Sequence, residues 1–432
     1  MSSPPGDAHP VIPPLGQVAR IPSVALFLVA TFVLEVGISA QFTALGKRVF
    51  DISRDELHLG LIGLAEFLPV ALLVLLTGAV ADRFDRRRVA SVALLVEAAF
   101  IVALLFEVRN DDATFGPIFL LVVGYSIGRA FLSPAIRAIP ATIVPPEMLP
   151  RISPLYSGAF QAGLITGPVA SGFLYAVDDW IPFALSAVCL TVGAALIPLV
   201  RLHPHAIQVE KHDATTGRLT EALQGLKVIR REPLLLGAIS LDLFAVLFGG
   251  AIALLPAVAE ERLGVGSIGF GWLRAAAGIG AAVTTAFLAF RPVQRNVGAT
   301  LFTVVGVFGV ATIVFGLTHN YVVAFVALFV LSAADSVSVF IRSTLVPLVT
   351  PNEVRGRVGA VENVFIGASN ELGAFESGVV GKALGAGPAI VVGGVATLGI
   401  VLVWPLLFPA IRRLDRFPFH HSLRATSPAA GS

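Results

Sequence analysis

Several ionisable residues lie inside long apolar segments of this chain, and four of them fall in the first, fourth, seventh and tenth segments: Glu35, Arg129, Asp242 and Asp335. A charge that faced lipid at the middle of a membrane would cost roughly 2.5–3.5 kcal/mol or more, so such side chains normally face protein or a water-filled passage. A dry environment favours a protonated carboxyl, whereas a nearby guanidinium favours the ionised form. We therefore expect Glu35 and Arg129 to form an ion pair. Either Asp242 or Asp335 is expected to exchange protons, and static ion pairs that only fix helix packing are the alternative.

The charged positions recur at a nearly constant spacing. Glu35 and Asp242 are 207 residues apart, and Arg129 and Asp335 are 206 residues apart. Composition alone would not place charges at matching positions in both halves of a chain. Internal repeats of this kind are typical of transporters whose substrate site lies between two halves, near the bilayer midplane.

Polar residues also form a stripe along residues 362–377. Positions seven residues apart share one face of a helix, and the stripe carries Glu362, Ser369 and Glu376 at this spacing, with Asn363, Asn370 and Ser377 beside them. At about 1.5 Å per residue the stripe is roughly 21 Å long. We expect it to line an aqueous or substrate-filled cavity, and hydrogen bonding between helices is an alternative explanation for part of it. Arg342, which shares a helix face with Asp335, is expected in the same cavity.

The elements that must position these residues are membrane-spanning helices. The chain has 432 residues, of which 56% are hydrophobic and only 13% charged, whereas a soluble protein carries roughly a quarter charged residues. A hydrocarbon core of about 30 Å needs roughly 20 apolar residues per helix. About twelve such runs occur, with approximate cores at 24–46, 59–81, 89–108, 116–140, 152–177, 180–200, 234–259, 268–290, 297–318, 321–348, 358–384 and 387–411.

Two short motifs add to this pattern. The loop after the second run contains Gly78, Asp82, Arg83, Arg86 and Arg87. The fifth run contains small residues four apart, which permit close helix contact, and a proline that can bend the helix: Gly163, Gly167, Pro168 and Gly172.

These motifs resemble those of the major facilitator superfamily, and the resemblance covers the whole chain. The resemblance implies an all-α membrane protein with twelve transmembrane helices in two pseudo-symmetric six-helix bundles. It also implies that Asp82 latches the two halves when the carrier faces outward. The glycine motif of the fifth run resembles that of exporting antiporters, and ordinary small-residue packing is its alternative explanation. The segment from Asn363 to Gly378 is similar to the branch that includes enterobactin exporters and multidrug efflux proteins.

Composition shifts divide the chain into five segments. We expect a disordered N-terminal tail over residues 1–20, a bundle over 21–202, a cytoplasmic linker with an interfacial helix over 203–232, a second bundle over 233–414, and a tail over 415–432. Basic residues collect in alternate loops, for example Arg83, Arg86, Arg87 and Arg88. The positive-inside rule then places both termini in the cytoplasm. We expect the chain in the inner (plasma) membrane.

The function expected from these observations is secondary active export of a small amphipathic organic molecule, drug-like or siderophore-like, by proton antiport with alternating access. An uptake or flipping carrier for a metabolite or lipid is the alternative, and a non-transporting membrane sensor is a further one. We expect no enzymatic activity, no cofactor and no metal, because no nucleotide-binding or catalytic constellation has the required context. The expected partners are a small-molecule substrate, protons and the lipid bilayer, without nucleic acid, and the expected state is a monomer.

Overall fold

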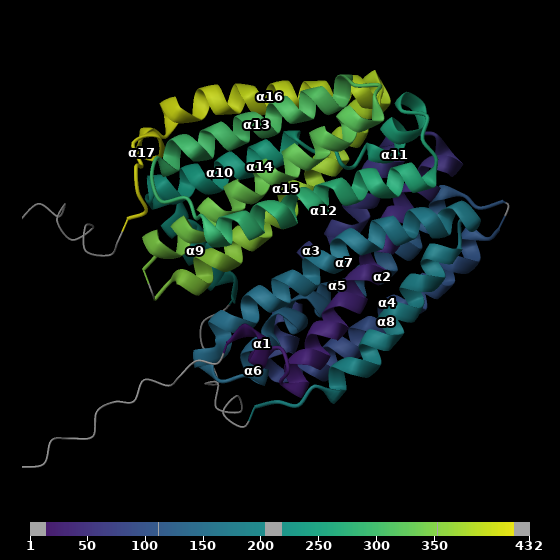
Figure 1. The fold of residues 1–432 in the computed structure, drawn as a ribbon, viewed down its shortest axis with the longest axis horizontal. Coiled ribbons are helices and arrows are strands. Elements are labelled where there is room, and N and C mark those ends of the chain that lie inside the picture. Colours follow the sequence, from purple (N-terminus) through teal and green to yellow (C-terminus); the bar gives the residue numbers. More distant parts are fainter. Residues whose placement is uncertain (1–13, 111, 204–217, 352, 419–432) are drawn as a thin grey trace, which may run out of the picture.

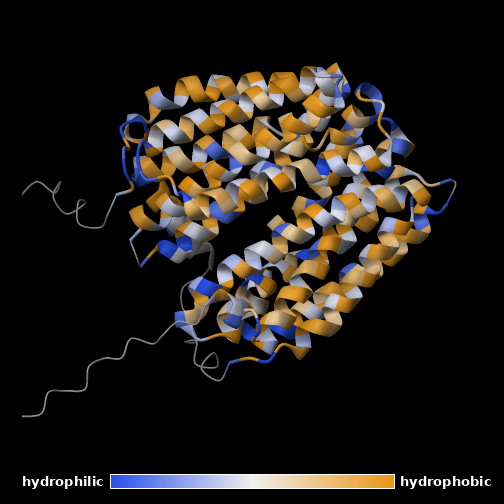
Figure 2. Cartoon of the chain, viewed as in Figure 1, coloured by the Kyte–Doolittle hydropathy of each residue, from blue (hydrophilic) through white to orange (hydrophobic). Residues whose placement is uncertain are grey.

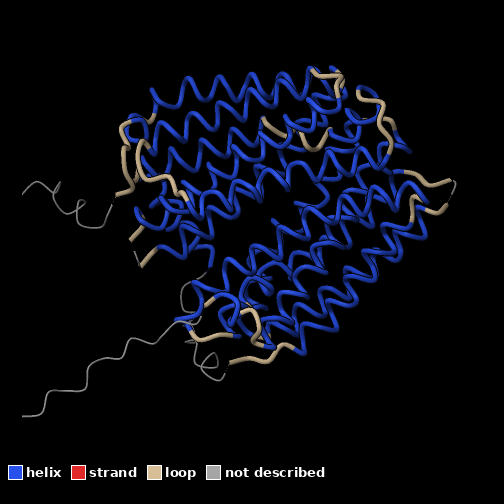
Figure 3. Tube along the Cα trace, in the orientation of Figure 1, coloured by secondary structure: helices blue, strands red, loops and turns tan. Residues whose placement is uncertain are grey.

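The computed structural model describes residues 14–418, apart from 111, 204–217 and 352 (Figure 1). Within these ranges the regular structure is helical, without strands, and the loops collect at the two ends of the molecule (Figure 3). The predicted tail over 1–20 falls mostly outside the described residues. Its last part includes a short helix, α1 (Leu15–Val18), because Val18 is fully buried against the bundle. The ordered chain thus begins earlier than the sequence predicts.

Twelve long helices in the described part of the chain form two bundles. The N-terminal bundle consists of α2 (Pro22–Ser53), α3 (Glu56–Arg83), α4 (Arg86–Val108), α5 (Phe115–Ala138), α7 (Leu149–Val177) and α8 (Ile181–Leu196). The C-terminal bundle consists of α10 (Pro233–Phe248), α12 (Ser267–Phe290), α13 (Val297–Leu317), α14 (Tyr321–Val349), α15 (Arg355–Leu384) and α16 (Ala386–Leu407). Shorter helical segments are α6 (Pro140–Ile143), α9 (Arg218–Arg231), α11 (Leu255–Ala257), a π-helix at Val258–Arg262 and α17 (Pro409–Arg412).

Local sequence signals start and stop these helices. The Asp55 side chain accepts a hydrogen bond from the Leu57 N–H (2.9 Å) and caps α3. Asn320 caps α14 in the same way, through the N–H groups of Val322 and Val323. Gly385, with φ of 85°, separates α15 from α16, a conformation that glycine adopts without strain.

Ten described helices are long and apolar enough to cross a membrane. Of the two others, α10 is only 16 residues long and α15 carries several charges. The seventh predicted run, 234–259, is therefore not one continuous helix. It breaks at Gly249 and Gly250, where a Cβ at Gly250 would lie 2.6 Å from the Gly373 carbonyl oxygen of α15. Hydrophobic residues make up most of the helices in Figure 2, and hydrophilic residues gather mainly at the helix ends, as expected of helices that cross a membrane.

Helix packing follows a twofold pattern. In the N-terminal bundle α2 packs on α7 and α8, α5 packs on α3 and α4, and α4 packs on α8. The C-terminal bundle repeats each pair: α10 with α15 and α16, α14 with α12 and α13, and α13 with α16. The two bundles meet through α3 with α15 and through α7 with α12, which are again equivalent pairs. The predicted pseudo-symmetric architecture is confirmed.

The bundles touch most closely away from the chain termini. We call the end that carries α1, α9 and α17 the terminal end and the other the far end. A Cβ at Gly378 of α15 would lie 2.7 Å from the Gly60 Cα of α3, and one at Gly271 of α12 would lie 3.0 Å from the Gly172 Cα of α7. All four glycines lie in the far-end halves of their helices. Figure 1 shows the ribbons converging at this end, beside α11.

Candidate functional site

A buried ion-pair cluster occupies the middle of the N-terminal bundle. Arg129 of α5 donates through Nη2 and Nε to Glu97 Oε1 of α4, at 2.7 and 3.2 Å. Its Nη1 lies 3.5 Å from Glu66 Oε1 of α3, and the Tyr125 hydroxyl also donates to that carboxyl. Glu97 is 0% and Glu66 6% exposed. With Glu35, these residues form what we call the Arg129 cluster.

The predicted ion pair between Glu35 and Arg129 is wrong in this structure, because Arg129 binds Glu97 and Glu66 instead. Glu35 Oε1 accepts a hydrogen bond from Ser39 Oγ at 3.3 Å, on its own helix. Its charge still interacts with that of Arg129. The sequence argument did not count Glu97 or Glu66 among the site residues, although both lie in apolar runs as Glu35 does. Intramembrane charge was the signal that could have included them.

The glycine motif of α7 explains how Glu35 fits. A Cβ at Gly163 would lie 2.5 Å from the Glu35 Cβ, and one at Gly167 would lie 2.7 Å from the Val36 carbonyl oxygen. Gly172 packs across the bundle interface on Gly271. These glycines therefore allow α7 to approach α2 on one side and α12 on the other.

Two further charges reach this cluster from the C-terminal bundle. The Arg274 guanidinium of α12 lies 4.4 Å from the ring centroid of Phe42, and its charge interacts with Glu66 and Glu371. Glu371 Oε2 of α15 lies 3.1 Å from where a Cβ at Gly63 of α3 would stand. The structure thus brings charges of both bundles together at their interface. The sequence argument did not include Arg274 or Glu371 among the site residues.

A second cluster lies inside the C-terminal bundle. Arg342 Nη2 of α14 pairs with Asp242 Oδ1 of α10 at 2.7 Å, with both side chains at most 7% exposed. Asp242, Asp335 and Ser338 line one small cavity between α10, α13 and α14. Glu362 of α15 interacts electrostatically with this group. We call Asp242, Asp335, Arg342 and Glu362 the Asp242 cluster; it joins four of the residues singled out in the sequence.

The polar stripe of α15 is divided between two environments. Ser369 and Ser377 are buried, whereas Glu362 and Glu376 are half-buried. Asn363 and Asn370 are exposed, and their side chains donate to carbonyls of the preceding turn, at 2.9 Å each. Lining of a substrate cavity by this stripe stays a prediction.

The loop motif at the terminal end is organised around Asp85. Its carboxylate accepts from the backbone N–H of Arg87 at 2.9 Å and pairs with the Arg87 guanidinium at 2.7 Å. This hydrogen bonding lowers the pKa of the Asp85 carboxyl below its usual value, although partial burial opposes the shift. Arg87 also donates to the Val200 carbonyl at 2.8 Å, within the N-terminal bundle. Gly78 and Asp82 belong to the last turns of α3, Arg83 ends that helix and Arg86 begins α4; the side chain of Asp82 lies outside the described part.

At the far end an ion-pair network joins the two bundles. Lys47 of α2 lies 3.0 Å from Glu260, which also pairs with Arg54. Lys382 of α15 pairs with Asp55 at 2.7 Å. Each cation of this network therefore meets a carboxylate.

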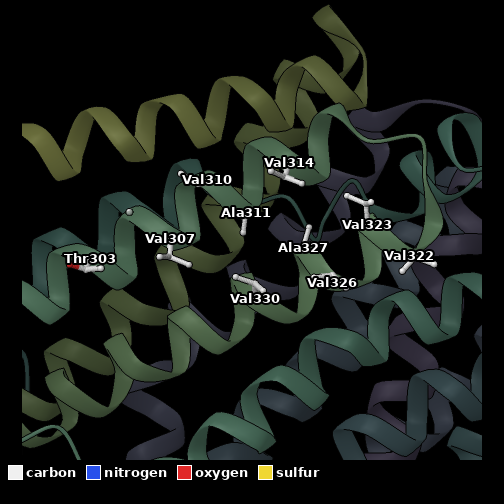
Figure 4. A pocket seen from close by; sticks show the side chains of 11 residues that line it. Thr303, Val307, Val310, Ala311, Val314, Val322, Val323, Val326, Ala327 and Val330 are labelled. Carbon is white, nitrogen blue, oxygen red and sulfur yellow. The ribbon is translucent and has the colours of Figure 1, made fainter.

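A groove of about 610 Å³ lies between α13 and α14 (Figure 4). Its lining consists of Thr303, Gly306, Val307, Val310, Ala311, Val314, Val322, Val323, Val326, Ala327 and Val330. None of these residues is ionisable, so the groove provides none of the proton chemistry predicted for the site.

Comparison with known proteins agrees with this architecture. The family model of the Major Facilitator Superfamily matches residues 27–374. The chain is 25% identical over 305 residues to the putative bacilysin exporter BacE of Bacillus subtilis (strain 168), covering 69% of this chain and 74% of that protein. It is 24% identical over 410 residues to the multidrug efflux pump Tap of Mycolicibacterium fortuitum, covering 90% and 96%.

Among solved structures, the nucleoside transporter NupG superposes with a TM-score of 0.70 at 13% identity, over 90% of this chain and 99% of that one. At this identity the likeness shows the fold alone. The family model, however, covers most of the chain, and the helix pairing repeats between the bundles. This chain is therefore a multi-pass membrane transporter that belongs to the Major Facilitator Superfamily.

Proposed function

We propose that this transporter exports small amphipathic organic molecules across the plasma membrane in exchange for protons. The termini lie on the cytoplasmic side in this proposal, as the distribution of basic loop residues favours. The bacilysin exporter and the multidrug pump among its relatives support the direction of transport.

The observation that carries the proposal is an excess of acids over cations in the two clusters. The Arg129 cluster, together with Arg274 and Glu371 from the facing bundle, has four carboxyls for two guanidiniums. The Asp242 cluster has three carboxyls for one guanidinium. A site that only fixed helix packing would be expected to balance its charges, because uncompensated charge in a dry interior is costly. Surplus carboxyls can instead be neutralised by protons or by a cationic substrate, and these two ligands then compete.

Competition of this kind converts a proton gradient into export. A cationic group that binds a surplus carboxyl favours its ionised form and expels the proton. A proton that enters from outside displaces the substrate in turn. Each charge that moves inward releases about 2.3 kcal/mol per 100 mV of membrane potential, and about 1.4 kcal/mol corresponds to a tenfold ratio. For a substrate that carries a cationic group but no net charge, such as a zwitterion, one proton per cycle is therefore sufficient for more than a tenfold gradient.

The packing of the bundles suggests which step of the cycle the structure represents. Glycine contacts and the ion-pair network hold the bundles together at the far end. In the proposed orientation this is the outer end, so the conformation is the one that receives substrate from the cytoplasm.

Transport in proteoliposomes with an imposed pH gradient tests the proposal. A panel of organic cations and siderophore-like compounds is offered, and substrate and proton fluxes are recorded together. Asp242→Asn and Asp335→Asn should abolish or weaken the coupling, whereas Glu353→Gln, in an exposed loop, is the matched control. Unchanged proton coupling in both Asp variants would reject their assignment, and no proton flux with any transported compound would reject antiport.

A further inference from the structure

Glu66 and Glu371 approach each other across the bundle interface. Glu371 Oε2 lies 3.1 Å from the position of a Cβ at Gly63. Glu66 is three residues further along α3, on the same side of that helix as Gly63. The two carboxyls also interact electrostatically. One acid from each bundle therefore meets at a contact that must open when the carrier changes conformation.

The surroundings of this pair contain too little positive charge to neutralise both acids. From α12 the pair faces Arg274, and from α5 it faces Arg129. Arg129, however, makes its two hydrogen bonds to Glu97 of α4. Glu35 also interacts with Arg129, so four carboxyls share two guanidiniums, and the Tyr125 hydroxyl that donates to Glu66 adds no positive charge. The acids therefore outnumber the cations.

The other helices that pack on α15 add no charge next to Glu371. α16 contains no ionisable residue, and Gln224 of α9 binds Arg357 at the start of α15. On α10, Asp242 pairs with Arg342 and interacts with Glu362, which is nine residues away from Glu371 along α15. Glu56 of α3 lies against Gly381, ten residues beyond Glu371.

We propose that Glu66 and Glu371 share one proton while the far end is closed, and that loss of this proton separates α3 from α15. Two ionised carboxylates in a dry interface repel each other, and a single proton held by either one removes that repulsion. The backbones of α3 and α15 are in direct contact at Gly60 and Gly378, so a small separation breaks the contact instead of being absorbed by flexible side chains.

This inference rests on the proposed antiport and adds its coupling step. A proton taken up from outside closes the far end and turns the carrier toward the cytoplasm. A cationic substrate that binds there expels the shared proton, and the charged pair opens the far end. Glu66 and Glu371 are positioning residues in this scheme, since they act by moving helices.

Distance measurement between two spin labels tests the inference without any substrate. The single cysteine, Cys189, is replaced by Ser, and labels are attached at Asp112→Cys and Ala383→Cys, two exposed far-end positions in different bundles. The molecules divide into a wide population, with the longer distance between the labels, and a narrow population, with the shorter distance. Between about pH 6.5 and pH 8.5 the ratio of the wide to the narrow population should rise by at least about threefold, since release of one proton allows this ratio to change up to tenfold per pH unit. Glu371→Gln and Glu66→Gln should each hold the narrow population at both pH values.

Two control variants, and the ionisation of the far-end carboxyls, exclude other titrating groups. His58, stacked on Phe115 at the far end of α3, belongs to a residue type that titrates in this window, so His58→Gln should keep the wild-type response, as should Glu353→Gln. Asp55 and Glu260 of the far-end network have pKa values held below their usual range by hydrogen bonds from Lys382 and Lys47, against the opposing effect of partial burial. They therefore stay ionised throughout the window.

A wild-type response that survives in Glu371→Gln, or a distance that does not depend on pH in the wild type, overturns the inference. If Glu371→Gln does not fold, Glu66→Gln gives the same decision. Because no transport is measured, failure here leaves the proposed export to be judged by the proteoliposome assay alone.

Discussion

Replacement of Glu97 by Gln removes one charge from the most deeply buried ion pair of the N-terminal bundle. The Glu97 side chain is 0% and that of Arg129 is 21% exposed. Removal of one partner from a buried pair typically costs about 3–5 kcal/mol, since the other charge stays buried. Glu66 remains 3.5 Å from Arg129, and Gln keeps an oxygen that can accept. We therefore expect a loss of about 3 kcal/mol, at the lower end of that range.

A melting curve of the purified protein in detergent measures this loss. For a folding unit of 150–250 residues, 1 kcal/mol corresponds to about 2–4 °C, so the Tm should fall by roughly 6–12 °C. Glu107→Gln, on the same helix nearer the membrane surface, is the matched control and should stay within about 0.5 kcal/mol of the wild type. The double variant Glu97→Gln with Arg129→Gln should lose less stability than the two single variants added together. If Glu97→Gln had the same Tm as the Glu107→Gln control, the structural importance assigned to this pair would be refuted.

Three other perturbations follow from the geometry. Gly378→Ala would place a Cβ 2.7 Å from a backbone atom of α3, so it should widen the far end, measured as faster thiol labelling of a cysteine placed there. The pair of Asp55 with Lys382 involves a carboxyl of lowered pKa, so its stabilisation of the closed far end is present above the unfolded pKa of about 3.9 and is lost as pH falls through the folded value. Labelling should therefore accelerate in strong acid, separately from the opening expected between about pH 6.5 and pH 8.5, and Lys382→Gln should remove the acid-induced acceleration alone. Gly163→Val should force α7 away from Glu35 and abolish transport with normal amounts of protein in the membrane, whereas normal transport would show that the close contact is dispensable.

Much of the fold follows from features that a linear sequence displays directly. Apolar runs long enough to cross a bilayer predict where the helices lie, since lipid requires every backbone polar group to be paired within its own helix. The repeat that relates Glu35 to Asp242 predicted the twofold arrangement, which the helix pairs of the two bundles confirm. The break of the seventh helix at Gly249 was missed, because it depends on how closely α15 approaches.

The partners of the buried charges depend on the tertiary structure. The sequence by itself determined that Glu35, Arg129 and Asp242 avoid lipid, because the cost of a charge in hydrocarbon does not depend on what the neighbours are. It did not determine that Arg129 binds Glu97 instead of Glu35, or that Glu371 reaches α3. Such pairings depend on differences of a few Å in the rotation and spacing of packed helices, which many distant side chains set together.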